Sequence, residues 1–288
     1  MPVPRCHFAA DLHGSLERYD KLFAAAARDR PAAILLGGDL LPGFGGTGGP
    51  PLGDGGFLLE ALAPRLARLR EATAPEPPEV FAVFGNDDPR VEEEALRELE
   101  SRGLLVYLHG TRRRCHGHDL YGYGCVPPTP FLLKDWERYD VSRHLDPGDV
   151  SPEEGWRTVP VRPGEVRWGT IAGDLAELAG TGDLEGAIFL FHAPPYDTPL
   201  DRAALDGRLV DHVPLDPHVG SIAIRRFLEA RQPLAALCGH VHESARLTGE
   251  WRTRLGRTVC LSAAHDGPEL ALVRFPLDAP GSASRELL

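Results

Sequence analysis

The chain has 288 residues, 42% of them hydrophobic, and a formal net charge of −11. This size predicts one large domain with a substantial core, over 1–278, followed by a tail over 279–288. The acidic balance argues against a nucleic-acid partner, and no stretch approaches the roughly 20 apolar residues that a membrane helix needs.

Strand and helix patterns alternate over the first hundred residues. Apolar runs predict buried strands over three segments: 6–11, 32–39 and 80–86. Helices are expected near three others: 15–29, 57–73 and 90–102. Ser15 is placed to cap the first helix, and Pro64 to bend or break the start of the second. The Gly- and Pro-rich stretch 42–56 predicts a flexible loop at the rim of a site, since it lacks the GK[ST] ending of a Walker motif.

The pattern changes beyond residue 103. Two strands joined by a polar turn are predicted over 104–109 and 119–125. The stretch 126–169 has little periodicity, which predicts a long loop or lid whose aromatic residues pack on the body. Further elements are expected in this order: helix 170–179, strand 187–192, helix 221–231, strand 234–240, and two or three antiparallel strands over 251–277. The tail from Pro280 is expected to fray. Alternating βα units followed by hairpins predict an α/β fold of two packed sheets with helices outside.

The cysteines and the N-terminal segment both favour a cytoplasmic protein. Five cysteines occur without a CxxC pair, and the odd number argues against disulfides or a thiolate zinc site. No charged region followed by a long apolar segment opens the chain, so no signal peptide is expected. We therefore expect buried free thiols. The oligomeric state has no signature in the sequence.

Residues that can bind metal ions stand at or just past the ends of five apolar runs. They are Asp11, His13, Asp39, Asn86, His192, His240 and His242. Because open α/β sheets place their sites beyond the carboxyl ends of their strands, these side chains are expected to meet at one spot. Carboxylate, imidazole and amide oxygen ligands together suit two divalent ions, and Asp39 is suited to bridge them. Two ions about 3.5–4 Å apart trap a bridging hydroxide and clamp an in-line displacement at phosphorus.

In this order the segments resemble the calcineurin-like metallophosphoesterase superfamily, whose pattern is DxH, GD, GNH[DE], H and GHxH. The resemblance extends from Asp11 to His242 and implies a four-layer α/β/β/α sandwich of two mixed sheets. It implies one metal held by Asp11, His13, Asp39 and His242. It implies a second held by Asp39, Asn86, His192 and His240. The metals would be Mn, Fe, Zn, Co or Ni, with manganese favoured. A GNDD variant with an HVGS segment resembles a bacterial and archaeal subgroup of uncharacterised phosphoesterases.

Position 87 departs from the family pattern, because Asp87 stands where the family typically has a histidine. That histidine is assigned to stabilise the transition state or to protonate the leaving oxygen. A carboxyl group with an ordinary pKa near 4 is ionised at neutral pH and donates no proton. Three alternatives follow. In the first, His218, just before a predicted helix, replaces the missing histidine as the catalytic acid. In the second, the substrate has a leaving group that needs no acid, such as a phosphoanhydride or an aryl ester. In the third, the protein is a weak enzyme or none.

Three functions compete on these residues. We favour a metal-dependent phosphoesterase that hydrolyses a small phosphomonoester or phosphodiester. A nuclease would use the same chemistry but needs a basic groove, which the net charge of −11 opposes. A degenerate family member could act as a protein-binding scaffold, but every ligand that the resemblance implies is present.

Other features between the ligand segments are assigned to the surface or to the rim of the site. His116 and His118 form an HxH pair in a charged segment with the arginines at 112–114, where a solvated surface turn is expected. Those arginines would contact a substrate phosphate only if the turn folded over the site. Tyr123 and the segment 126–140 are candidates for a lid or a specificity wall.

Overall fold

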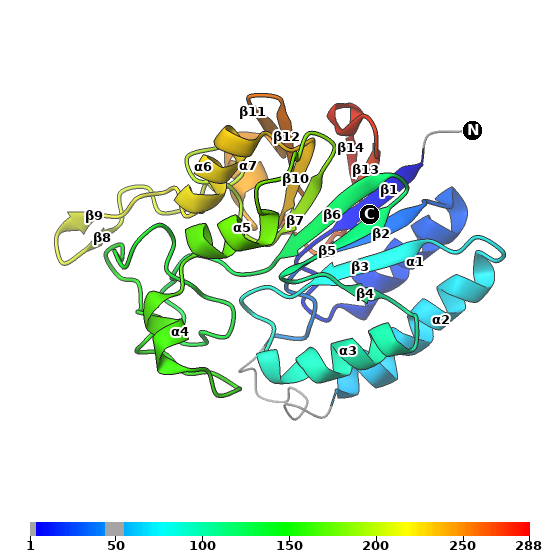
Figure 1. Cartoon of the computed structure of the whole chain (residues 1–288), viewed down its shortest axis with the longest axis horizontal. Coiled ribbons are helices and arrows are strands. Elements are labelled where there is room, and N and C mark those ends of the chain that lie inside the picture. Colours follow the sequence, from blue (N-terminus) through cyan, green and yellow to red (C-terminus); the bar gives the residue numbers. More distant parts are fainter. Residues whose placement is uncertain (1–3, 44–54) are drawn as a thin grey trace.

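Two six-stranded mixed sheets pack face to face, with helices on their outer faces (Figure 1). The structure, a computed structural model, describes residues 4–43 and 55–288. The first sheet has the order β14 (Ser284–Leu287), β13 (Ala271–Pro276), β1 (Arg5–Ala9), β2 (Ala33–Gly37), β3 (Glu79–Val83), β4 (Val106–Tyr107). The second has the order β11 (Arg252–Leu255), β12 (Thr258–Ser262), β10 (Ala235–Cys238), β7 (Ile188–Phe191), β6 (His118–Tyr123), β5 (Thr111–Cys115). The predicted α/β/β/α sandwich is confirmed.

The central strands of both sheets are parallel and buried on both faces, which is why they are nearly continuous apolar runs. In β2, Ala33 and Leu35 pack between the sheets, whereas Ile34 and Leu36 pack under helices. Because strand side chains alternate in direction, each central strand contributes to both core layers. All five cysteines are buried free thiols, as predicted.

Two groups of helices cover the outer faces of the sheets (Figure 1). The first sheet is covered by α1 (Leu16–Asp29), α2 (Ala63–Ala72) and α3 (Glu93–Ser101). The second is covered by α5 (Ile171–Ala179) and α6 (Ile222–Arg231). The predicted cap at Ser15 is confirmed, because its side chain accepts the Arg18 N–H. None of the helices in the described part of the chain has the length and apolar character that crossing a membrane requires.

Short elements join these main ones. They are η1 (Phe57–Leu62), η2 (Arg90–Glu92), α4 (Pro163–Trp168), β8 (Leu209–Val210), β9 (Val213–Pro214), α7 (Ser244–Thr248) and η3 (Pro280–Ser282). The helix predicted over 57–73 begins with π-helical η1 and continues as α2, with Pro64 in its first turn. Proline has no backbone N–H to donate, so a local change of winding at this point is expected. Most of the Gly-rich stretch 42–56 lies outside the described residues.

Two sequence predictions about strands are wrong. The tail from Pro280 does not fray: β14 pairs antiparallel with β13, and Leu270 and Leu288 exchange two backbone hydrogen bonds of 2.9 Å. The segments 104–109 and 119–125 do not form a hairpin, because β4 belongs to the first sheet and β6 to the second, and a parallel bridge joins them at His109 and Gly122. The polar turn expected between them contains β5, an edge strand of the second sheet. An edge strand keeps charged side chains in solvent, so its sequence resembles a turn.

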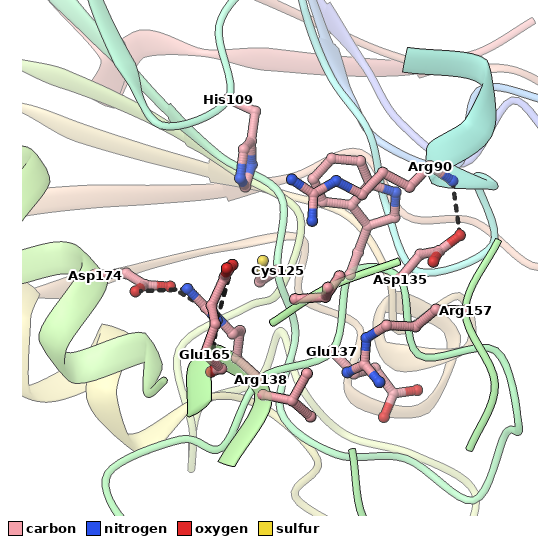
Figure 2. Close-up of a pocket in the computed structure, with 12 residues that line it drawn as sticks. Arg90, His109, Cys125, Asp135, Glu137, Arg138, Arg157, Glu165 and Asp174 are labelled. Atoms are coloured by element: carbon pink, nitrogen blue, oxygen red, sulfur yellow. Dashed lines mark hydrogen bonds and ion pairs between the residues drawn. The ribbon is translucent and has the colours of Figure 1, made fainter. Parts of the chain in front are cut away.

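The long segment 126–169 is irregular apart from α4, but it is fastened to the body by buried polar contacts. Trp136 donates to the Asp88 backbone carbonyl at 2.8 Å. Arg138 forms two hydrogen bonds with Asp174 of α5, at 2.9 and 3.1 Å, beside a small cavity of about 70 Å³ (Figure 2). Arg90 and Arg157 also line this cavity, and four carboxylates balance the three guanidinium groups. The packing of the aromatic residues on the body, predicted from the sequence, is confirmed for Trp136 and Tyr139, which are buried, and is wrong for Phe131 and Trp156, which are 60% and 39% exposed.

A fully buried ion pair lies inside the same segment and gives a test of its packing. Lys134 and Glu137 are both 0% exposed, with 2.5 Å between Nζ and Oε2. Lys134→Met should lower the free energy of unfolding by about 3–5 kcal/mol, because it leaves a buried carboxylate without its cation. Urea unfolding measures the loss. Adding Glu137→Gln to Lys134→Met should restore most of it, and an equal or larger loss in the double variant would contradict this account.

Candidate metal centre

The seven predicted ligand residues meet at the carboxyl ends of strands from both sheets. Asp11 and His13 follow β1, Asp39 follows β2, and Asn86 follows β3. His192 follows β7 in the second sheet, and His240 and His242 follow β10. Because the two sheets face each other, their strand ends deliver these side chains to one place. Four of the seven have backbones with positive φ: Asp11, His13, Asp39 and His240. Such conformations are costly for residues with a side chain and cluster at functional sites.

One group of four side chains, Asp11, His13, Asp39 and His242, places a donor atom from each residue within 4.8 Å of the others. The Nε2 atoms of His13 and His242 are 3.1 Å apart. His242 Nε2 lies 3.7 Å from Asp11 Oδ1, and His13 Nε2 lies 3.9 Å from Asp39 Oδ2. Both carboxylates are buried, whereas both imidazoles remain about a third exposed or less, so this group borders solvent.

A second group shares Asp39 with the first and adds His192 and His240. His192 Nε2 lies 3.2 Å from Asp39 Oδ2 and 3.1 Å from Asn86 Oδ1. The rings of His192 and His240 have centroids 5.1 Å apart. Asp39 therefore stands between two clusters of nitrogen and oxygen donors, which is the position of a bridging ligand.

The donor atoms are arranged to coordinate a cation rather than to form hydrogen bonds with one another. Burial leaves Asp11 Oδ2 without a hydrogen-bond partner in the described part of the chain. His192 Nδ1 lies 2.8 Å from the Gly37 carbonyl, an arrangement that places the proton of the neutral ring on Nδ1. In that neutral ring the Nε2 lone pair would face the oxygens of Asp39 and Asn86, which are acceptors, so this point requires a positive charge, either a proton on Nε2 or a metal ion. A divalent ion between these atoms would turn the repulsion into coordination.

The electrostatics of the centre also favour positive charge. Burial disfavours an imidazolium at His192, but the Asp39 carboxylate outweighs it and raises the pKa of His192 to about 10. Burial opposes the ionisation of Asp39, yet His192 and other neighbours hold its pKa well below the usual range. In contrast, burial and the charge of His192 lower the pKa of His240 to about 3. His240 is thus a neutral imidazole, the form that binds metal.

Gly38 and Gly85, which precede Asp39 and Asn86, leave room for the side chains of the centre. A Cβ at Gly85 would come within 2.5 Å of His192 Nε2 and would also overlap the Asp39 carboxylate. Gly38 has φ +94°, and a Cβ there would overlap the His192 ring. Only glycine fits before Asp39 and Asn86 in the GD and GN dipeptides, because the backbone itself forms the wall of the centre at these positions.

The sequence model of calcineurin-like phosphoesterases matches residues 4–244, a span that contains all seven of these side chains. The chain belongs to the calcineurin-like phosphoesterase family. A comparison with curated proteins gives no match.

Solved structures with the same fold are distant in sequence from this family member. TT1561 of Thermus thermophilus is 17% identical, with a TM-score of 0.55 over 99% of each chain. An archaeal phosphodiesterase is 8% identical, with a TM-score of 0.43 over 99% of each chain. A dimetal phosphatase from Danio rerio is 13% identical, with a TM-score of 0.47 over 95% of this chain and 92% of that one. The likeness to TT1561 supports the fold, and the other two are too remote to carry an argument.

Asp87, the departure from the family's pattern, lies at the edge of the centre. Its Oδ2 is 3.8 Å from His13 Nδ1, and its backbone N–H donates to Asp39 Oδ1 at 2.9 Å. Burial and the nearby Asp39 charge raise the pKa of Asp87. A carboxylate on the far nitrogen of a ligand histidine orients the ring toward the metal. The geometry thus gives Asp87 contact with His13 through the nitrogen that does not face the other ligands.

Asp88 is a functional residue that sequence reasoning missed. It is fully buried, and its carboxylate accepts backbone N–H groups of Leu40, Leu41 and Gly85 at 2.8 Å each. These bonds tie the loop after β2, which carries Asp39, to the loop after β3, which carries Asn86. The only sequence signal was the second acidic residue of GNDD, and two of its three partners, Leu40 and Leu41, lie more than 40 positions away.

His218 does not join the ligand groups, but it lines a larger cavity together with His240. Its Nδ1 lies 2.8 Å from Oδ1 of Asp201, which is fully buried. Asp201 also accepts the backbone N–H groups of Asp197 and Thr198, at 2.8 and 2.9 Å. Asp201 is thereby held in place and can fix the ring of His218 by accepting a hydrogen bond from Nδ1. Asp201 was not predicted, because 17 residues separate it from His218.

Other sequence candidates lie away from the centre. Tyr123 is buried and donates to Asp174 at 2.7 Å, so it is no lid residue. His118 binds Asp278 and the Gly186 carbonyl, at 2.7 and 3.0 Å. The arginines at 112–114 are on β5 rather than in a turn, and they form ion pairs with Asp119 and Glu100. Residues 127–131, within the predicted specificity wall, do line the larger cavity.

Proposed function

We propose that the chain is a dinuclear metal-dependent phosphoesterase that hydrolyses a small phosphomonoester or phosphodiester, with manganese the favoured metal. The observation that carries the proposal is the pair of donor groups that share Asp39. When bound there, two divalent cations supply an activated water and neutralise charge on the phosphoryl group. Asp11, His13, Asp39 and His242 would hold one cation. Asp39, Asn86, His192 and His240 would hold the other.

The residues of the chain supply positioning and proton transfer. Asp88 ties together the loops that carry Asp39 and Asn86, so both ligands keep their places without rearrangement. His218, held at Nδ1 by Asp201, would as an imidazolium donate its Nε2 proton to a leaving alkoxide. His218 and the ligand His240 line the same cavity, which supports a shared substrate. This assignment gives His218 the role that Asp87 is poorly suited to fill.

Metal removal and return tests the proposed function. Protein stripped with a chelator should hydrolyse no aryl phosphate or aryl phosphodiester, and added Mn²⁺ should restore turnover together with about two ions per chain. Repeating the assay with Zn²⁺, Co²⁺, Ni²⁺ and Fe²⁺ ranks the metals by the turnover that each supports. Full turnover in the chelator would contradict metal dependence. No turnover with any ion, at less than one metal per chain, would favour a protein-binding scaffold, and hydrolysis of single-stranded DNA at moderate salt would favour a nuclease.

A further inference from the structure

A cavity of about 380 Å³ opens beside the candidate metal centre and has His240 and His218 in its wall. Its other walls come from residues 127–149 and 196–222, the two long segments between ligand blocks. Gly148 packs against the β8–β9 hairpin, since a Cβ there would lie 3.3 Å from Val210. The two segments thus meet around the cavity. A volume of this size is within the range of small-molecule sites, which runs from roughly 300 to 1,000 Å³.

Most of the wall is apolar. Its apolar residues include Pro128, Phe131, Val141, Leu205, Leu215 and Ile222. Phe131 is 60% exposed, although it is a large aromatic residue. Singly exposed apolar residues are common, but one that borders an apolar cavity adds to the surface that a ligand can cover. The wall therefore favours an apolar organic group next to the reacting phosphate.

The charged residues of the wall are all acidic or histidine. No lysine or arginine lines the cavity among the described residues, whereas five carboxylates do: Asp140, Asp146, Asp149, Asp216 and Glu243. Three of these already accept hydrogen bonds from the protein. Asp140 accepts from the start of α6, Asp216 from the Tyr196 hydroxyl, and Glu243 from the Ala204 N–H.

The remaining two, Asp146 and Asp149, add negative charge to the wall, where Asp146 Oδ1 lies 3.9 Å from His144 Nε2. Burial and the charge of Asp146 raise the pKa of Asp149 to about 6. A second anionic group on a substrate would therefore meet carboxylates and neither lysine nor arginine, which is unfavourable in a partly desolvated site.

We propose that the substrate is a phosphoester whose alcohol part has an apolar body, carries no second anionic group, and tolerates a positive charge. This inference rests on the proposed function, since it takes the phosphate to lie at the metal centre. It excludes nucleoside polyphosphates and polynucleotides as preferred substrates, because their further phosphates would lie along an acidic wall.

Three aryl phosphates with a remote substituent test the substrate class: 4-propylphenyl, 4-(trimethylammoniomethyl)phenyl and 4-(carboxymethyl)phenyl phosphate. The propyl and carboxymethyl compounds have electronically similar leaving groups and form the matched pair, whereas the ammonium group makes its phenolate a better leaving group. With Mn²⁺-loaded protein, kcat/KM for the carboxylate should be at least about tenfold below the other two, because like charges disfavour binding. Leu215→Lys should narrow that gap, whereas Leu247→Lys, a change on α7 outside the cavity, should leave it unchanged. Equal rates, or a preference for the carboxylate, would overturn the inference while leaving the proposed function standing.

A binding experiment that needs no turnover tests the cavity's ligand preference independently of the proposed phosphoesterase function. The phosphate-free products 4-propylphenol and 4-hydroxyphenylacetate are titrated into metal-free protein and followed by ligand-observed NMR. We expect 4-propylphenol to bind, Leu215→Lys to weaken it at least about fivefold, and 4-hydroxyphenylacetate to bind more weakly by a similar factor. If no phosphate is hydrolysed but this pattern holds, the proposed function fails and the cavity's preference stands. Equal binding of both products, or no effect of Leu215→Lys, refutes the preference whether or not the enzyme turns over.

Discussion

Replacing Asp39 with asparagine is expected to abolish turnover and to lower bound metal from about two ions per chain to one or fewer. Asp39 Oδ2 lies 3.2 Å from His192 Nε2 and 3.9 Å from His13 Nε2, so this carboxylate serves both donor groups. An amide is neutral and offers one oxygen, so it cannot neutralise two cations. We expect kcat/KM to fall by about 10³-fold or more, which corresponds to about 4 kcal/mol of transition-state stabilisation.

Elemental analysis and hydrolysis of 4-nitrophenyl phosphate measure the two effects in one preparation. Asp20→Asn is the matched control, because Asp20 is an exposed carboxylate on α1 that pairs with Arg65. It should keep both metals and full activity. Thermal unfolding of the metal-free proteins checks that Asp39→Asn still folds. An Asp39→Asn protein with full metal content and undiminished turnover would refute the bridging role.

Replacing His218 with glutamine is expected to affect substrates according to their leaving groups. If His218 protonates the leaving oxygen, hydrolysis of an alkyl phosphate should fall by about 10²–10⁴-fold, since alkoxides require a proton. Hydrolysis of 4-nitrophenyl phosphate should fall by less than about tenfold, because nitrophenolate departs as an anion. Metal content should not change, because His218 is outside both donor groups.

His265→Gln serves as the control for this prediction. His265 pairs with Glu269 at 2.9 Å and does not line the cavity, and glutamine keeps a donor for that contact. An equal loss for alkyl and nitrophenyl substrates would assign His218 to binding or folding rather than to acid catalysis. If His218→Gln lowers turnover of neither substrate, a natural substrate whose leaving group needs no acid becomes the favoured alternative.

The convergence of the seven candidate ligands could be predicted from the sequence because each lies at or just past the end of an apolar strand. Parallel strands leave all such residues at one edge, so Asp11 and His240 could be placed together without knowledge of the strand order. Asp88 and Asp201 could not be found in this way. Each acts through backbone N–H groups or a histidine from elsewhere in the chain, and those contacts exist only after folding.

Two strands, β5 and β14, were not predicted from the sequence because they lack a clear strand pattern. The exposed arginines of β5 show a turn-like composition, and β14 is too short to have a clear period. Both are edge strands, which pair with a single neighbour, β6 or β13, and leave their other edge open, so neither needs the apolar run of a central strand. Central strands such as β2 have apolar side chains on both faces, and these were assigned correctly.

The most direct test of the account is anomalous scattering from crystals grown with Mn²⁺. Two peaks about 3.5–4 Å apart are expected, with the Asp39 carboxylate in contact with both and Asn86 in contact with only one. A single peak, or manganese bound away from Asp39, would contradict the account.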